Sequence, residues 1–185
     1  MRQIGDGDIN LTQPRFFWLA ITLAAAIATL VTIIVVATSV VNPPPAQAQG
    51  TCNGKATTID GTTGPDTKNG TTGADVISLL AGDDQSNAVD GDDNVCGDQG
   101  DDTLSGGLGV DTMSGGPGAD DVSGDAGNDT IRGQQGDDDT LSGGDGDDTI
   151  AGGPGDDNID GGTGTDTCVG GPGTDTFSGC ENTTQ

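Results

Sequence analysis

Large apolar side chains recur at intervals of nine residues along most of this chain. Each is flanked by residues that are mostly Thr, Asn, Ser or Asp. A polar, apolar, polar triplet is typical of a short strand that points one side chain inward and two outward. The pattern therefore predicts short strands joined by turns of six residues. The apolar positions are Ile77, Val95, Leu104, Met113, Val122, Ile131, Leu141, Ile150, Ile159, Cys168 and Phe177.

Residues 61–178 divide into thirteen repeat units, whose residues are numbered here as places one to nine. One unit cannot bury an apolar face by itself, so the units must stack on one another. Two units would form a lap of about eighteen residues, with successive laps about 4.8 Å apart. The expected fold is all-β, a flat coil with two parallel sheets of short strands. The units begin at Gly61, Gly70, Leu79, Ala88, Gly97, Gly106, Gly115, Gly124, Gly133, Gly143, Gly152, Gly161 and Gly170.

Place four is Gly in every unit, which indicates a turn with a positive φ. Place six is Asp. In the unit from Gly133 an extra residue leaves a choice between Asp138 and Asp139, and Asp139 is preferred because it precedes Thr-Leu, as Asp102 does. The place-four residues are Gly64, Gly73, Gly82, Gly91, Gly100, Gly109, Gly118, Gly127, Gly136, Gly146, Gly155, Gly164 and Gly173. The place-six residues are Asp66, Asp75, Asp84, Asp93, Asp102, Asp111, Asp120, Asp129, Asp139, Asp148, Asp157, Asp166 and Asp175.

The charge of the chain decides what these aspartates do. Thirty acidic residues face five basic ones, giving a formal net charge of -25, and aromatic residues make up only 2%. Stacked laps would bring carboxylates close together. These negative charges would repel one another unless a cation lay between them. Calcium accepts six to eight oxygen ligands in flexible geometry, whereas magnesium demands a strict octahedron. The absence of His argues against imidazole-bound zinc or copper.

The repeat resembles the hemolysin-type calcium-binding repeat, or RTX nonapeptide, G-G-x-G-x-D-x-U-x, in which U is a large apolar residue. The match is close in the units at 106–114, 115–123 and 143–151, and in those from Gly152, Gly161 and Gly170. The resemblance covers residues 61–178. It implies a parallel β-roll, a β-solenoid with several calcium ions between its turns, bound by the place-six Asp residues and by backbone carbonyls.

The amino-terminal units depart from this pattern. Lys68 and Ser86 occupy apolar places, and Leu79-Leu80 and Ala88-Val89 replace the paired glycines, so weaker calcium sites are expected there. The extra residue in the unit from Gly133 predicts a bulge in one turn. Thirteen units leave at most about eleven gaps between turns on the same side.

Residues 1–48 differ from the rest of the chain. Arg2 and Arg15 precede an apolar run at 16–41, and Ala46-Gln47-Ala48 is typical of a signal-peptidase site. The run is also long enough to span a bilayer, so a retained membrane anchor is the alternative to cleavage. Either interpretation places the repeats outside the cytoplasm. The predicted domains are a signal peptide at 1–48, a cap at 49–60, the calcium-binding roll at 61–178 and a cap at 179–185.

Four Cys residues in an exported chain favour two disulfides. Order along the chain favours Cys168 with Cys180, and Cys52 with Cys96, although a regular coil would separate the second pair by about two laps. A free thiol pair or a metal site is the alternative.

The sequence favours a non-enzymatic, extracellular calcium-binding protein that folds when calcium fills its turns. With neither His nor Tyr, no supported catalytic triad is available, and the acidity argues against nucleic-acid binding. A membrane partner is expected only if residues 1–48 are retained. Two other roles remain: a surface or adhesive module that holds a protein or matrix partner, and ice binding, which the irregular residues at place five disfavour.

Overall fold

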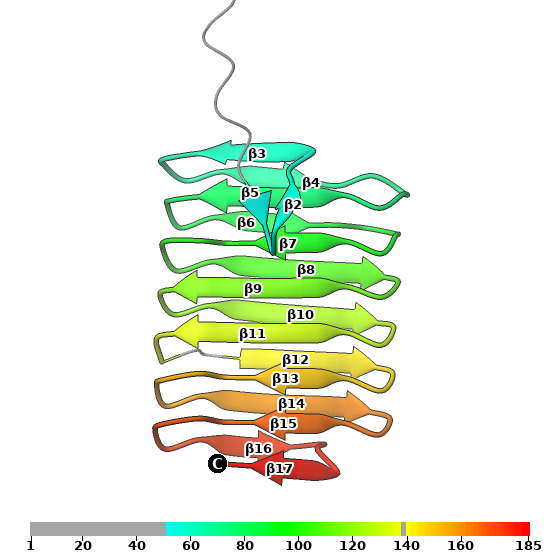
Figure 1. Cartoon of the computed structure of the whole chain (residues 1–185), viewed down its shortest axis with the longest axis vertical. Helices are drawn as coiled ribbons and strands as arrows, with labels where there is room; N and C mark the ends of the chain where they lie inside the picture. The colour runs from blue at the N-terminus through cyan, green and yellow to red at the C-terminus, as the bar shows by residue number, and fades with distance from the viewer. Residues whose placement is uncertain (1–50, 138–139) are drawn as a thin grey trace, which may run out of the picture. The chain divides into compact units, whose positions relative to one another are not determined.

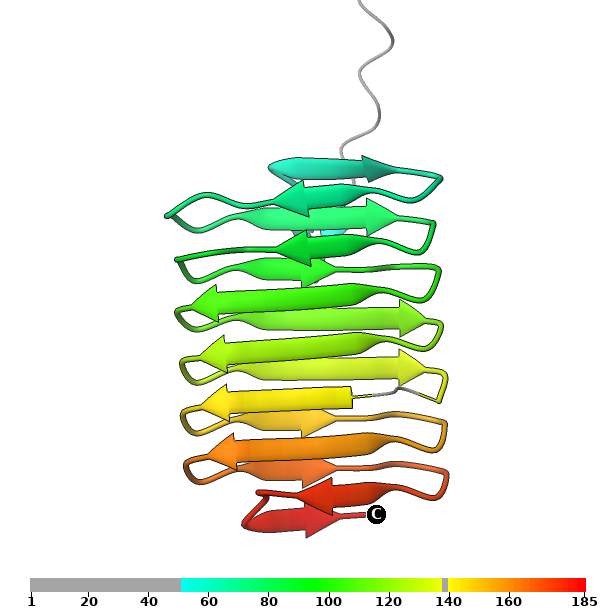
Figure 2. The same cartoon turned by 180° about the vertical axis from the view of Figure 1, so that it is seen from behind.

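Fifteen short strands form two stacked parallel sheets in the computed structural model, which describes residues 51–137 and 140–185. The seven-stranded sheet has the order β16-β14-β12-β10-β8-β6-β4, and the eight-stranded sheet has the order β17-β15-β13-β11-β9-β7-β5-β3. Figures 1 and 2 show the two sheets from opposite sides, with the chain alternating between them along the stack. The predicted all-β solenoid with two parallel sheets is confirmed.

The strands are β1 (Thr51–Cys52), β2 (Lys55–Ala56), β3 (Ile59–Thr62), β4 (Thr67–Asn69), β5 (Val76–Leu80), β6 (Gln85–Asn87), β7 (Asn94–Cys96), β8 (Thr103–Leu108), β9 (Thr112–Pro117), β10 (Asp121–Ala126), β11 (Thr130–Gln135), β12 (Thr140–Asp145), β13 (Thr149–Ala151), β14 (Asn158–Thr163), β15 (Thr167–Val169), β16 (Thr176–Ser178) and β17 (Asn182–Thr184). All these strands belong to one compact unit, Ala48–Gln185. The predicted signal segment lies outside the described residues. No helix in the described part of the chain is long and apolar enough to cross a membrane.

The register confirms that two repeat units make one lap. Val122 pairs with Leu104, eighteen residues earlier, and with Leu141, nineteen residues later. The extra residue causes the longer step. Asp137 still occupies place five, because its Oδ1 accepts the backbone N–H of Asp156 (3.0 Å). The insertion is thereby confined to the segment between Asp137 and Thr140, and the predicted ligand Asp139 lies outside the described residues.

The core is a single column of apolar side chains between the sheets. The apolar place-eight residues from Ile77 to Cys168 are at most 1% exposed, Phe177 is partly buried, and Leu79 and Ala88 add two buried side chains at place one. One apolar residue per nine makes this a thin core. Hydrophobic burial alone therefore supplies little stability per residue.

Place-four glycine is required by the contact between laps as well as by its dihedral. From Gly82 to Gly164 these residues have φ between 128° and 157°. In addition, a Cβ built on Gly109 would overlap the carbonyl oxygen of Gly91, one lap earlier. Gly64, in the first lap, has no atom within 4 Å of such a Cβ. The predicted positive φ is confirmed for the ten residues Gly82 to Gly164 and does not hold for Gly64, Gly73 and Gly173.

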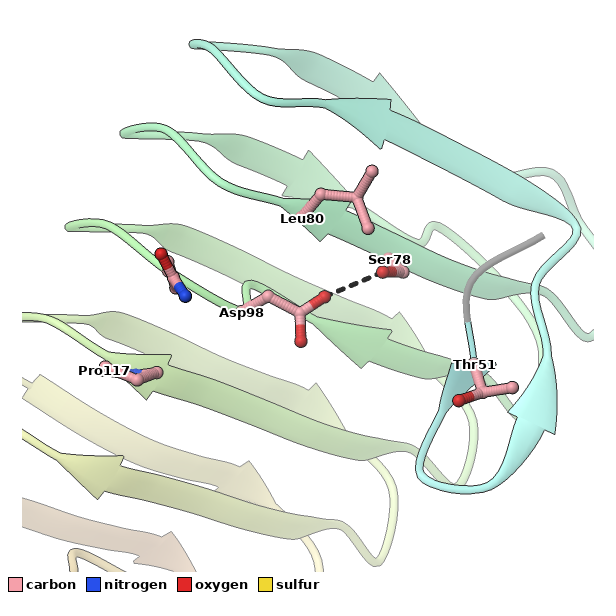
Figure 3. Close-up of a pocket in the computed structure, with 6 residues that line it drawn as sticks. Thr51, Ser78, Leu80, Asp98 and Pro117 are labelled. Atoms are coloured by element: carbon pink, nitrogen blue, oxygen red, sulfur yellow. Dashed lines mark hydrogen bonds between the residues drawn. The ribbon is translucent and has the colours of Figure 1, made fainter. Parts of the chain in front are cut away.

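Place two tolerates side chains, because a residue there points across the outer face of a sheet. Asp98 has φ 71° and its carboxylate accepts the hydroxyl of Ser78 at 2.8 Å, as Figure 3 shows. Asp125 accepts the hydroxyl of Ser105 at 2.6 Å in the same way. These bonds join each place-two side chain to the preceding lap, which offsets part of the strain of a left-handed residue other than Gly.

Both predicted disulfides are present. Cys52 lies in the hairpin β1–β2, which folds over the outer face of the eight-stranded sheet. Its sulfur forms a disulfide with Cys96 on β7. Figure 1 shows this hairpin in front of β5 and β7. A hairpin crossing the laps explains how residues two laps apart along the coil are joined. Cys168 bonds to Cys180 at the carboxyl-terminal end of the core.

Candidate metal centre

The place-six aspartates form two ladders, one at each edge of the roll. In nine steps of these ladders, the backbone N–H of one aspartate donates to the carboxylate Oδ1 of the aspartate one lap later, over 2.6 to 3.1 Å. The described members of one ladder are Asp66, Asp84, Asp102, Asp120, Asp157 and Asp175. Those of the other are Asp75, Asp93, Asp111, Asp129, Asp148 and Asp166. Twelve of the thirteen predicted ligands thus lie in the turns, and for nine of them Oδ1 is held by a neighbouring lap.

The second carboxylate oxygen of the later ladder residues is buried and has no hydrogen-bond partner among the described residues. This holds for Oδ2 of Asp84, Asp93, Asp102, Asp111, Asp129, Asp148, Asp166 and Asp175. An unpartnered carboxylate oxygen costs several kcal/mol when it is removed from water. A row of such oxygen atoms is expected where a cation binds to them.

Several of these unpartnered oxygens lie beside a backbone carbonyl from the next lap. A Cβ built on Gly106 would overlap both Oδ2 of Asp111 and the carbonyl oxygen of Gly124. The same pair of oxygens, from the unit's own Asp and the next Gly, surrounds place one in the units from Gly97, Gly124 and Gly143. Glycine at place one therefore leaves a cradle of carboxylate and carbonyl oxygens that any side chain would fill.

Burial changes the acidity of the central ladder residues. It raises the pKa of Asp102, Asp111 and Asp120 to about 6 and that of Asp129 to about 7, from 3.8. For Asp102 the neighbouring carboxylates of Asp120 and Asp84 raise the pKa further. Without a cation these turns hold protons close to neutral pH.

The first lap satisfies its aspartates in a different way. Thr71, at place two, donates its backbone N–H to Oδ2 of Asp75 (2.7 Å), and its hydroxyl lies 2.9 Å from the same oxygen and 3.3 Å from the carbonyl oxygen of Gly73. Thr62 makes the equivalent contacts with Asp66. Later in the chain, the place-two N–H points to the next lap instead, as from Asp98 to the Gly115 carbonyl at 3.0 Å. Left-handed φ at place two accompanies this change, and it is found for non-Gly residues as varied as Leu80, Val89 and Asp98.

A cationic side chain also offsets the negative charge of the first turn. The ammonium group of Lys68 lies 3.3 Å from Oδ1 of Asp66. The pKa of Asp66 is lowered, first by the hydroxyl and backbone N–H of Thr62 and less by Lys68. The first turn is therefore neutralised by groups of the chain itself.

One ladder residue was missed by the sequence reasoning. Glu181 accepts the backbone N–H of Asp166 at 2.8 Å through Oε2, so it continues the second ladder by one step. The signal was a shortened unit, in which Gly179-Cys180-Glu181 precedes the polar triplet of β17. The shortened unit shifts Glu181 out of the nine-residue phase that Asp166 and Asp175 follow.

The donors present suit calcium better than other common metals. Among residues 51–137 and 140–185 no three His, Cys, Asp or Glu side chains gather at one point. Each gap between laps offers two carboxylates, and backbone carbonyls would complete the shell of six to eight oxygens. The groove lined by Thr51, Ser78, Leu80, Asp98, Gln99 and Pro117 lies beside the hairpin and contains no ladder residue.

Stacked turns with paired carboxylates and hard oxygen donors define a roll that binds calcium. The model of the family described as RTX calcium-binding nonapeptide repeat (4 copies) matches residues 60–95, 87–122, 114–141, 135–168 and 142–177. These matches cover well over half of the sequence, and the chain belongs to this family, which binds calcium through the aspartate ladders of a β-roll. Neither the curated proteins nor the solved structures contained a match.

Proposed function

We propose that this chain is an exported, non-enzymatic domain whose roll folds when several calcium ions bind between its turns. The observation that carries this proposal is the row of buried Oδ2 atoms that lack a hydrogen-bond partner. A thin core cannot offset the burial of so many carboxylates, whereas a divalent cation that binds only the folded chain stabilises it.

The ligands we assign are the place-six aspartates of the units from Leu79 onward. The best sites lie between Gly97 and Ser178, where place one is Gly in every unit and the cradle is open. Asp84 and Asp93 form weaker sites, because buried Leu79 and Ala88 fill place one in their units. Asp139 lies outside the described residues and stays a ligand predicted from the sequence.

The first lap is assigned no full calcium site. The hydroxyls of Thr62 and Thr71 lie between the carboxylate oxygen and the place-four carbonyl, where a cation would need to bind. The hydrogen bonds donated to Oδ2 of Asp66 and Asp75 take the place of metal coordination.

An extracellular location follows from several features together. Proteins of this family are generally secreted. Two disulfides also persist best in an oxidising environment. Low calcium inside the cell would keep the chain loose before export, and higher calcium outside would fold it. The repeat domain is what the family match identifies, and we assign the chain a structural rather than a catalytic role.

The two other roles stay predictions. A rigid acidic roll could serve as an adhesive module, and no contact on the described surface specifies a partner class. Ice binding through place five is disfavoured further, because Oδ1 of Asp92, Asp101 and Asp147 accepts the backbone N–H of the next lap. Those side chains therefore fold against the stack and form no regular outward row.

The test is a calcium titration of the full chain, with both disulfides formed, followed by far-ultraviolet circular dichroism. Strand signal is expected to rise cooperatively as calcium reaches millimolar concentrations, and equal magnesium is expected to produce little. An unchanged spectrum at saturating calcium would refute the proposal. A magnesium response equal to that of calcium would refute the choice of metal.

A further inference from the structure

We infer that Glu181 completes an additional calcium site at the carboxyl-terminal end of the roll, together with Asp166. This inference rests on the proposed calcium binding by the other turns. The terminal turn adds one gap between successive turns to the eleven such gaps that thirteen regular units provide. Glu181 is the one Glu in a chain of 29 other acidic residues, all of them Asp.

The first observation is the ladder bond itself. Asp166 donates its backbone N–H to Oε2 of Glu181, just as Asp148 donates to Oδ1 of Asp166, and both distances are 2.8 Å. The backbone also keeps the register, because the N–H of Asn182 donates to the carbonyl of Asp166 at 3.0 Å, as that of Thr167 does to Asp148. The terminal turn is thus a true further lap.

The second observation is independent of Glu181. Oδ2 of Asp166 is buried and has no hydrogen-bond partner in the described part of the chain, and the residue is 0% exposed. A Cβ built on Gly161 would overlap the carbonyl oxygen of Gly179 and also Oδ2 of Asp166. The cradle of the central turns therefore recurs here, with Gly179 supplying the carbonyl.

The longer side chain of Glu follows from the shorter turn. Thr167 pairs with Asn182, a separation of fifteen residues where regular laps have eighteen. Gly179 reverses the chain with φ 62°, and the disulfide from Cys180 to Cys168 holds it against the core. The extra methylene group of Glu lets its carboxylate reach the ladder from a turn that has lost three residues.

The terminal site differs from the central ones in its exposure. Glu181 is exposed, whereas the central ladder carboxylates are buried. Solvent can supply ligands that the missing residues do not, and calcium readily retains water in its shell. We therefore assign this site a lower affinity than the central sites, and it fills last in a titration.

The test compares Glu181→Gln with the unaltered full chain. Gln keeps an oxygen that can accept the N–H of Asp166 but loses the charge. Asp121→Asn is the matched control, because it removes one exposed carboxylate at the start of β10 that is not a member of either ladder. Native mass spectrometry at saturating calcium counts the bound ions, and the Asp166 amide resonance reports the terminal gap during a titration.

The expected result is one ion fewer for Glu181→Gln and a midpoint for the Asp166 amide at least about tenfold higher in calcium. Asp121→Asn is expected to match the unaltered chain. Equal ion counts and equal Asp166 midpoints for Glu181→Gln would overturn the terminal site while leaving the other sites intact. Failure of the unaltered chain to bind calcium would instead overturn the proposed function, and this inference with it.

Discussion

The first lap and the central laps share one repeat but neutralise their aspartates differently. In the turns of Asp66 and Asp75, Thr hydroxyls and backbone N–H groups reach the inner carboxylate oxygen. In the turns of Asp102, Asp111, Asp129 and Asp148 that oxygen is buried beside a carbonyl and has no hydrogen-bond partner among the described residues. The difference arises at place two, where Thr keeps an ordinary φ and later residues turn left-handed. The conformation at place two thus distinguishes the first lap from the later turns.

Removal of central carboxylates should have the largest effect. The double variant Asp111→Asn/Asp129→Asn removes the charge from two successive aspartates of one ladder and leaves side chains of similar shape. We expect at least two fewer bound ions and a folding midpoint about tenfold or more higher in calcium, because each cation loses a charged ligand. Ion counting by native mass spectrometry and circular dichroism measure the two quantities. The matched variant Asp66→Asn/Asp75→Asn should keep the ion count, and an equal loss in both variants would remove the distinction between the laps.

Glycine substitution should come next in size. Gly109→Ala places a Cβ on the Gly91 carbonyl at a residue with φ 135°, so we expect about 3 kcal/mol or more of lost stability in saturating calcium. Gly64→Ala meets no atom within 4 Å and should change stability by less than about 1 kcal/mol. Urea unfolding of both variants measures this. Similar losses would show that lap stacking is not what requires Gly at place four.

The pH dependence should change sign with calcium. Burial raises the pKa of Asp102, Asp111 and Asp120 to about 6 and that of Asp129 to about 7, from 3.8. Between pH about 4 and pH about 7 the metal-free roll therefore binds more protons than the unfolded chain does. The stability of the metal-free roll is thus greatest below pH about 4 and is lost as the pH rises through 6 to 7. Calcium holds the carboxylates ionised, so its affinity should fall as pH drops through the same range.

Circular dichroism at several pH values, on chain freed of metal and on chain with calcium, measures both trends. Strand signal should appear in the metal-free chain on acidification from pH about 7.5 to 4.5. A metal-free chain that loses structure over this range would contradict the assignment of buried, protonated aspartates.

The smallest expected effect is a gain. Thr71→Gly removes the hydroxyl that holds Asp75 and permits a left-handed place two, at which the backbone N–H can turn from Asp75 to the next lap as in the later units. We expect one additional bound ion of weak affinity, because the Gly also costs about 1 kcal/mol of backbone entropy. Thr72→Gly makes the same chemical change at an exposed position with no contact to Asp75, and it should add none. An unchanged count in Thr71→Gly would mean that Thr71 does not block the site.

Much of this structure could be predicted because the repeat sets period, strand direction and core together. The place-eight column, the two sheets and both disulfides follow from positions along the chain. The role of Thr62 and Thr71 could not be predicted, because it depends on which way one peptide N–H points. Glu181 was hidden by a deletion that shifted its phase, and the hairpin crossing to Cys96 depends on a fold back over the sheet. Local departures from a repeat can be interpreted only when the contacts in three dimensions are known.

Amide hydrogen exchange, compared lap by lap with and without calcium, tests most directly whether cations hold the central turns. The ladder amides of Asp102, Asp111 and Asp129 are buried in hydrogen bonds to the next lap. We predict exchange near the rate of an unstructured peptide for these amides in metal-free chain at neutral pH, and slowing by about a hundredfold or more in calcium. The amide of Thr71 should change less. Strong protection of the central ladder amides without calcium would contradict the account.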